Sequence, residues 1–354
     1  MNPADLARPE IRALKPYASA RTQAGAGGIL LNANENPFPN GDEGASALNR
    51  YPDPQPPELI RRLAGFYGVR TDQVLITRGS DEGIDLLTRA FCRPDSDRVL
   101  VCPPCFGMYA MSAHIAGARV VEVPLIDHGE TFELDAAGIA RAPACRLYFL
   151  CSPNNPTGNR IEAATVTELS AEVAGHGLVV LDEAYQEFQD RPSLAAAVDS
   201  HPNLVVLRTL SKAFALAGGR IGAVIANPEV IELLRRIIPP YPVPTPSASA
   251  ALRVLSPPGL ARLGRQLKRL AGEKTRLVQA LREHPYISQI WPGEANFVLV
   301  RAANGPGLVA AAAAAGIQLR CQSAQPGLFN AVRISVGAPE ENDQFIKFLR
   351  GWQP

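Results

Sequence analysis

Short runs of β-branched and other apolar residues recur along the middle of the chain, and most of them end in a polar residue. They cover residues 74–77, 99–101, 120–123, 147–150, 178–181, 204–207 and 223–225. Several are almost continuously apolar, which is the pattern of strands that are covered on both faces. Helix-like stretches lie between most of them, at residues 82–91, 162–174 and 229–238. This alternation predicts a doubly wound α/β fold with a mostly parallel sheet.

A second unit is predicted after the proline-rich stretch at residues 239–244. Leucines near helical spacing over residues 259–282 predict a long connector helix. A small α+β pattern follows, with strands at 297–300, 317–319 and 332–336, an alanine-rich helix at 308–317 and a last helix that Pro339 opens. We therefore expect an N-terminal arm (1–45) that packs on the small domain or on a partner subunit, a large domain (46–250) and a small domain (251–354).

The composition is that of an ordinary folded protein, with 46% hydrophobic and 19% charged residues among 354. At about 150 residues per domain, this length favours two domains. A net charge of +1 gives no field that would attract nucleic acid or an anionic membrane. No apolar run approaches the roughly 18 residues of a membrane span, and the first residues do not resemble a secretion signal. We expect a cytoplasmic enzyme that acts on small molecules.

Metal and redox chemistry are not predicted. The six cysteines are expected to stay reduced in a chain of this size. Cys102 and Cys105 have CxxC spacing, but no second pair follows at the spacing of a metal site, and the five histidines are dispersed. A dinucleotide site is not indicated either, because the chain has no GxGxxG motif.

Polar residues follow several predicted strands, at the edge where parallel sheets bind ligands. Residues 78–83 run from a strand into a helix, whose first N–H groups suit a phosphate. The alternative is an ordinary helix cap at Ser80 or Asp81. The segments after the next strands carry further polar and charged groups. They are the Asn155 amide, the Asp182 carboxylate, the Tyr185 phenol, the Thr209 and Ser211 hydroxyls, the Lys212 amine and the Arg220 guanidinium. Together these groups can hold a phosphate and supply an amine.

The order of these motifs along the chain is characteristic. Asn-Pro-Thr-Gly, Asp-x-x-Tyr and Ser-Lys with an arginine eight residues beyond the lysine resemble the fold-type I pyridoxal-phosphate aminotransferases. Within that fold, the chain resembles the class II histidinol-phosphate aminotransferase family at residues 31–37, 50–53, 79–82, 209–214 and 333–337. The resemblance extends from about Tyr17 to Trp352. It implies a seven-stranded sheet in the large domain and a homodimer with shared active sites.

The resemblance also implies roles around pyridoxal 5′-phosphate. The catalytic residues would be Lys212, which bonds the cofactor and moves a proton, Asp182, which pairs with the ring nitrogen, and Tyr185, which with Asn155 donates to the ring oxygen. The phosphate would be bound by Ser80, Asp81, Glu82, Thr209, Ser211 and Arg220, and by Tyr51 of the other subunit. Phe106 would stack on the ring in place of the family's usual tyrosine. That substitution removes a hydroxyl but keeps the stacking surface.

Four further residues are implied to bind substrate. Arg320 and Arg333 would hold its anionic group, and Tyr17 and Asn34 would close over it. The implied reaction is transamination between histidinol phosphate and 2-oxoglutarate, giving imidazole-acetol phosphate and glutamate in histidine biosynthesis. No metal is implied.

Other functions remain open on the sequence alone. An aromatic or broad-specificity aminotransferase, or a phosphothreonine-type decarboxylase, would share the cofactor residues and differ in the bond that is broken. A binding or regulatory protein on the same scaffold is disfavoured because Lys212 and Asp182 are both present. A dehydrogenase is disfavoured because the dinucleotide motif is missing.

Overall fold

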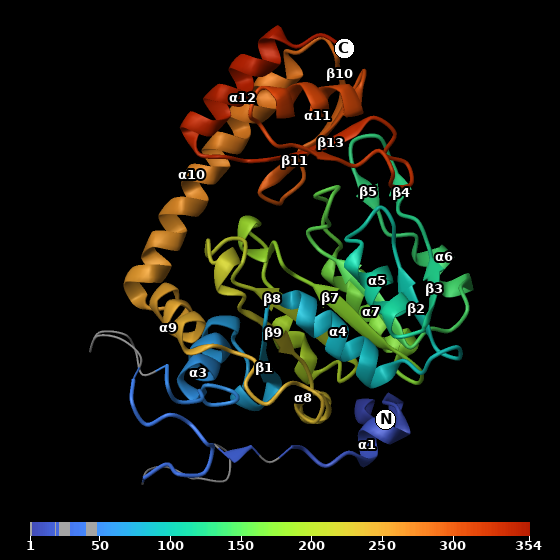
Figure 1. Ribbon diagram of the computed structural model, residues 1–354. Coiled ribbons are helices and arrows are strands. Elements are labelled where there is room, and N and C mark those ends of the chain that lie inside the picture. The colour runs from blue at the N-terminus through green and yellow to red at the C-terminus, as the bar shows by residue number, and fades with distance from the viewer. Residues whose placement is uncertain (1, 18, 21–28, 40–47) are drawn as a thin grey trace.

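The computed structural model describes residues 2–17, 19–20, 29–39 and 48–354. A large sheet with helices on both faces lies at one end of the molecule, and a smaller sheet with its own helices lies at the other (Figure 1). The long helix α10 (Pro257–Arg282) runs from the first part to the second.

The larger sheet has seven strands in the order β1-β9-β8-β7-β6-β2-β3. Their bounds are β1 Val74–Thr77, β2 Arg98–Val101, β3 Arg119–Glu122, β6 Leu147–Cys151, β7 Leu178–Asp182, β8 Leu204–Thr209 and β9 Gly222–Ile225. The pairs β8-β7, β7-β6, β6-β2 and β2-β3 are parallel, and β9 runs antiparallel to both of its neighbours. The predicted α/β fold with a mostly parallel seven-stranded sheet is confirmed.

Alternating residues of the central strands are buried in two separate cores, one on each face of the sheet. In β8, Leu204 and Val206 belong to one core, whereas Val205 and Leu207 belong to the other. The first core is covered by α3 (Pro57–Tyr67), α6 (Ala136–Arg141), α7 (Ala163–Val173) and α9 (Thr245–Val254). The second is covered by α4 (Ser80–Phe91), α5 (Met108–Ile115) and α8 (Pro228–Arg235). Burial on both faces explains why these strands are nearly continuously apolar.

The small domain is an antiparallel sheet in the order β10-β11-β13-β12, packed against helices. Its elements are β10 Ile287–Trp291, β11 Phe297–Ala302, α11 Gly305–Ala314, β12 Arg320–Cys321, β13 Ala331–Ser335 and α12 Pro339–Gly351. The strand predicted at residues 317–319 lies later in the chain, as β12. The alanine-rich helix begins earlier than predicted because the Asn304 side chain caps it by accepting from Gly307 N, and Gly316, with φ of 81°, follows its end.

The N-terminal segment departs from its expected position. The turn η1 (Pro3–Leu6) is followed by α1 (Pro9–Ala13), and Leu6 and Ala7 are buried in the large-domain core that contains α4 and α8. The backbone N–H of Arg8 donates to Ala90 O at 2.9 Å. These first residues therefore pack on the large domain and not on the small one. Parts of the predicted arm, at residue 18 and residues 21–28 and 40–45, lie outside the described residues.

The remaining short elements are a two-stranded sheet of β4 (Ile126–Asp127) and β5 (Phe132–Glu133), and the 3₁₀ turns η2 (Thr71–Gln73), η3 (Gln186–Phe188), η4 (Ala195–Asp199) and η5 (Ala217–Gly219). Within the described part of the chain, no helix is long and apolar enough to cross a membrane.

Candidate active site

A cavity opens at the carboxyl ends of β6, β7 and β8, beside the start of α4. Its volume is about 590 Å³, counting the part that is open to solvent. All the residues expected to contact the cofactor line it except Glu82 and Tyr51: Ser80, Asp81, Phe106, Asn155, Asp182, Tyr185, Thr209, Ser211, Lys212 and Arg220.

Asp182 ends β7 with a carboxylate that is almost completely buried, at 2% exposure of the residue. Tyr109 Oη donates to its Oδ2 at 2.8 Å, and the backbone N–H of Ala184 donates to its Oδ1 at 3.0 Å. Burial raises the pKa of Asp182 to about 6, against the lowering effect of these two donors. A buried carboxylate of this kind strongly favours a cationic partner in the cavity.

Lys212 follows the end of β8 and directs its amine toward the same cavity. Its Nζ lies 5.7 Å from the centre of the Tyr185 ring. The residue is exposed, yet desolvation by the cavity wall, followed by the positive charge of Arg333, lowers its pKa below the ordinary lysine value. A lowered pKa increases the fraction of neutral amine, which is the nucleophilic form.

The start of α4 forms a phosphate-sized recess together with Arg220. Gly79 precedes the helix with φ of 81°, and a Cβ on it would stand 2.4 Å from Arg220 Nη2. Arg220 donates to Asp81 Oδ2 at 3.1 Å and to Ser211 Oγ at 3.3 Å. Free N–H groups, a guanidinium and hydroxyls around a helix N-terminus are the groups that bind phosphate.

Two arginines lie on neighbouring strands of the small domain, and one of them contacts a residue that lines the cavity. Arg333 in β13 is half-buried, and its Nη1 donates to Asn155 Oδ1. Arg320 in β12 is its direct cross-strand neighbour. Desolvation, and then the charge of Arg320, lowers the pKa of Arg333, whose buried Nε has no hydrogen-bond partner among the described residues. Two adjacent cations with an unused donor favour an anionic ligand.

Comparison with known proteins assigns the chain to a family. A family model described as "Aminotransferase class I and II" matches residues 27–349. The chain belongs to the class I and II aminotransferases. Histidinol-phosphate aminotransferase of Stenotrophomonas maltophilia (strain R551-3) is 46% identical to this aminotransferase over 347 residues, which are 97% of this chain and 95% of the relative. The enzyme of that name from Xylella fastidiosa (strain 9a5c) is 45% identical, with coverage of 99% and 96%.

Solved structures share the fold of this aminotransferase. Histidinol-phosphate aminotransferase from Clostridium acetobutylicum matches with a TM-score of 0.78 and 23% identity, over 86% of this chain and 90% of that one. The enzyme of that name from Sinorhizobium meliloti, in complex with pyridoxal-5′-phosphate, matches with a TM-score of 0.77 and 23% identity, over 97% of both chains. At this identity, the likeness establishes the fold.

The residues that line the cavity of the aminotransferase fit pyridoxal phosphate. Gly222 in β9 packs so close to the turn before α4 that a Cβ on it would lie 2.4 Å from Gly79 C. The Arg220 guanidinium adjoins that turn, while the buried Asp182 carboxylate faces the cavity from β7. An anion subsite and a carboxylate for a cationic ring nitrogen are therefore both present, with Lys212 in the same cavity.

Tyr109 is a site residue of the aminotransferase that sequence reasoning missed. It is fully buried, stacks on Phe149 at 4.9 Å between ring centroids, and holds Asp182 through its hydroxyl. The signal available in the sequence was its position three residues after Phe106, which places both aromatic rings near one another at the start of α5.

Besides Arg320 and Arg333, four implied residues of the aminotransferase do not line the cavity. The Glu82 carboxylate accepts from the backbone and side chain of Arg78. Tyr51 stacks on Tyr241 at 4.5 Å between ring centroids and is 47% exposed. Tyr17 is 73% exposed, and Asn34 lines a separate hollow with Tyr51. Their implied roles toward cofactor and substrate therefore remain predictions.

Proposed function

We propose that this aminotransferase binds pyridoxal 5′-phosphate and transfers the amino group of histidinol phosphate to 2-oxoglutarate, giving imidazole-acetol phosphate and glutamate in histidine biosynthesis. The observation that carries the proposal is that Arg333, the cross-strand neighbour of Arg320, contacts Asn155 in the wall of a cavity that also holds Lys212 and Asp182. Histidinol phosphate and 2-oxoglutarate both carry an anionic group that these two arginines could bind. Relatives named histidinol-phosphate aminotransferase, at 45–46% identity over nearly the whole chain, support the choice of substrate.

The chain's own residues prepare the cavity for this reaction. When bound, pyridoxal phosphate supplies an electrophilic carbon and a ring that accepts electrons. Asp182 would keep the ring nitrogen protonated, and Phe106 would stack on the ring. Asn155 uses its Oδ1 to accept from Arg333 and so keeps its amide N–H groups free to donate, together with Tyr185, to the ring oxygen.

Lys212 would carry the proton during the reaction. Because desolvation and the charge of Arg333 lower its pKa, Nζ would release a proton more readily than an ordinary lysine and could take it up again in the cavity. Ser80, Asp81, Thr209, Ser211 and Arg220 would hold the phosphate, and Glu82 would order the recess by binding Arg78.

A panel of amino donors tests the substrate assignment. Purified protein loaded with pyridoxal phosphate is assayed with 2-oxoglutarate and histidinol phosphate, aromatic amino acids or phosphothreonine, and the products are identified. We expect glutamate and a keto product, with the highest kcat/KM for histidinol phosphate. A preference for an aromatic amino acid would reassign the substrate, and release of CO₂ with an amine product would identify a decarboxylase.

Arg333→Ala is expected to lower kcat/KM for both histidinol phosphate and glutamate by about two to three decades. Losing a charged hydrogen bond to a desolvated anion costs on the order of 2–5 kcal/mol, and each decade corresponds to about 1.4 kcal/mol. Arg320→Ala should impair the phosphate substrate more than glutamate, because a phosphate can accept from two guanidinium groups. Separate kinetics of the two half-reactions measure both effects.

Arg350→Ala provides the matched control, because Arg350 is an exposed residue near the end of α12. Its kinetics should match those of the wild type. Unchanged half-reactions in Arg333→Ala, or an Arg320→Ala defect confined to glutamate, would contradict the proposed anion site.

We also infer a cytoplasmic homodimer in which Tyr51 binds the cofactor phosphate of the other subunit. The exposed, stacked position of Tyr51 and the family resemblance at residues 50–53 support this inference. The six cysteines all carry free thiols, which fits a reducing compartment.

Tyr51→Phe is expected to weaken pyridoxal phosphate binding several-fold, by about 1 kcal/mol for one hydrogen bond, without dissociating the dimer. Titration of the apo-protein and sedimentation velocity measure the two quantities, with Tyr286→Phe in the small domain as the control. An active monomer, or unchanged cofactor affinity in Tyr51→Phe, would disprove the shared site.

A further inference from the structure

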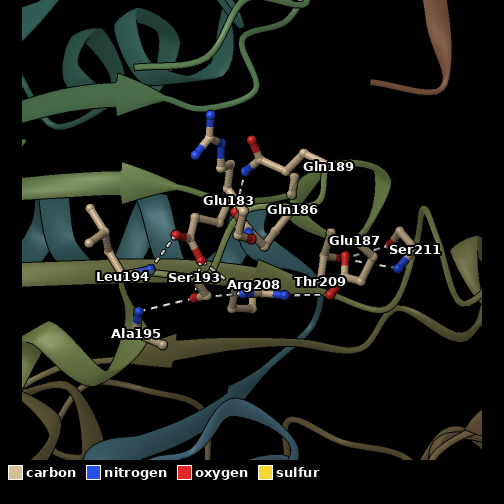
Figure 2. Close-up of polar contacts among 12 residues, drawn as sticks. Glu183, Gln186, Glu187, Gln189, Ser193, Leu194, Ala195, Arg208, Thr209 and Ser211 are labelled. Atoms are coloured by element: carbon tan, nitrogen blue, oxygen red, sulfur yellow. Dashed lines mark hydrogen bonds and ion pairs between the residues drawn. The ribbon is translucent and has the colours of Figure 1, made fainter. Parts of the chain in front are cut away.

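A buried, charged cluster lies directly behind the cavity. Arg208 Nη1 donates to Glu183 Oε2 at 2.8 Å and to Ser193 Oγ at 2.9 Å, and its Nη2 donates to Glu187 (Figure 2). Glu183 Oε1 also accepts from Leu194 N at 2.8 Å. The side chains of Arg208 and Glu183 are each only 3% exposed. The cluster therefore joins two strand ends to η3 and the loop that follows it, and its central pair is almost completely buried.

The cluster and the cavity use alternate residues of the same two strands. Thr209 and Asp182 line the cavity, whereas their chain neighbours Arg208 and Glu183 do not. Successive side chains of a strand point to opposite faces. Asp182 is paired with Leu207 in the β7-β8 ladder, and the backbone N–H of Glu183 extends that ladder by donating to Leu207 O at 3.0 Å.

Stability alone does not account for this cluster. Its one guanidinium faces two carboxylates, and Glu187 Oε2 and Arg208 Nε are buried without hydrogen-bond partners among the described residues. Buried ion pairs often stabilise a fold less than apolar residues of the same volume, but their fixed geometry can impose one arrangement. The forked guanidinium is suited to fixing two groups at once, and the Tyr67 ring packs 4.7 Å from its carbon.

We propose that Arg208 and Glu183 are positioning residues that hold the ends of β7 and β8 in fixed register, and so set Asp182 and the Thr209–Lys212 segment at their working separation. Asp182 and Thr209 lie one residue away from the cluster on either strand, and Lys212 follows three residues after Thr209. This inference rests on the proposed cofactor function, because it assigns the cluster a role in cofactor binding.

The test compares three cluster variants, Glu183→Gln, Arg208→Lys and Ser193→Ala, with a control at the opposite end of β8. There, Ser170 Oγ donates to Asn203 Oδ1 at 2.8 Å in a buried pair next to the first residue of the strand. Ser170→Ala therefore removes a buried hydrogen bond beside the end of this strand that lies away from the cavity. The readouts are the thermal midpoint, the Kd of pyridoxal phosphate for the apo-protein, and the pH midpoint of the bound cofactor's visible absorbance.

We expect Glu183→Gln and Arg208→Lys to raise the Kd by about tenfold or more, as residues that support a site commonly do, and to shift the pH midpoint. Ser193→Ala should show a smaller change in the same direction. Ser170→Ala should lower the thermal midpoint and leave the Kd within about twofold of the wild type.

The outcomes distinguish this inference from the proposed function. A wild-type protein that does not bind pyridoxal phosphate would contradict the proposed function itself. Normal binding by the wild type, with unchanged Kd and pH midpoint in folded Glu183→Gln and Arg208→Lys, would overturn only the positioning role. Failure of all three cluster variants to fold would also overturn it, because the cluster would then serve the folding of the sheet.

Discussion

Lys212→Ala is expected to abolish transamination, with a loss in kcat/KM of at least about 10⁴-fold, the upper range for a group that transfers protons. The side chain lost is the amine that follows the end of β8 and faces the cavity beside Tyr185. The phosphate recess formed by α4 and Arg220 does not depend on this amine, so the variant should still bind pyridoxal phosphate noncovalently. Steady-state assays and absorbance spectra of the purified variant measure the two properties.

Lys268→Ala, on the exposed surface of α10, is the matched control and should behave as the wild type does. The lysine assignment would be wrong if Lys212→Ala turned over normally, or if its cofactor could still be trapped covalently by borohydride reduction.

Asp182→Ala is expected to reduce kcat by about 10²–10⁴-fold while leaving part of the cofactor bound, since in the proposed mechanism the carboxylate would act on the charge of the ring nitrogen and other residues would hold the phosphate. Asp182→Asn should show a similar loss, because it keeps the volume and one acceptor but removes the charge. Single-turnover kinetics with saturating cofactor separate this effect from cofactor loss. Near-normal turnover in both variants would exclude the assigned role.

The same carboxylate should affect the stability of the apo-protein. Burial raises the pKa of Asp182 in the folded state to about 6, from an ordinary value of 3.8. The folded state holds the proton of Asp182 more tightly than the unfolded state does. The favourable contribution of this group to the free energy of unfolding is therefore complete below about pH 4 and is lost as the pH rises through about 6. The wild-type apo-protein should therefore lose about 2–3 kcal/mol over this range relative to Asp182→Asn.

Urea denaturation of both apo-proteins at intervals from about pH 4 to pH 7 checks this difference. Asp182→Asn should become the more stable of the two above about pH 6. Parallel pH profiles for the two proteins would show that the carboxylate is not desolvated to this extent.

The sheet of the large domain could be predicted because each central strand is buried on both faces, and this leaves an apolar run in the sequence. Helix α5 was missed because its own apolar residues lie on most of its sides, so that its sequence shows no helical period. Helix α9 was missed because it begins directly after the proline-rich stretch and has a further proline, Pro246, in its first turn. The position of β12 could not be predicted either, since Arg320 and Cys321 join the sheet through pairing with β13, which no local pattern encodes.

The candidate site could be predicted where its residues directly follow strands, because a parallel sheet brings those positions to one edge. Lys212, Asp182 and Arg220 were found in this way. Tyr109 was not, because its contact with Asp182 depends on how α5 packs against the sheet. The Arg208 cluster was missed for a related reason, since its charged residues occupy strand positions that otherwise carry core side chains.

The hydrogen bond between Arg333 and Asn155 connects a strand of the small domain to a loop of the large domain. An anion that displaced Asn155 from Nη1 of this guanidinium would compete with the Asn155 carbonyl oxygen. Thermodynamic coupling is reciprocal, so a change that strengthens the bond between these two residues would weaken the binding of such an anion. If Arg333 binds the substrate anion as proposed, its affinity would be adjustable from the large domain, through a loop residue and without altering either arginine.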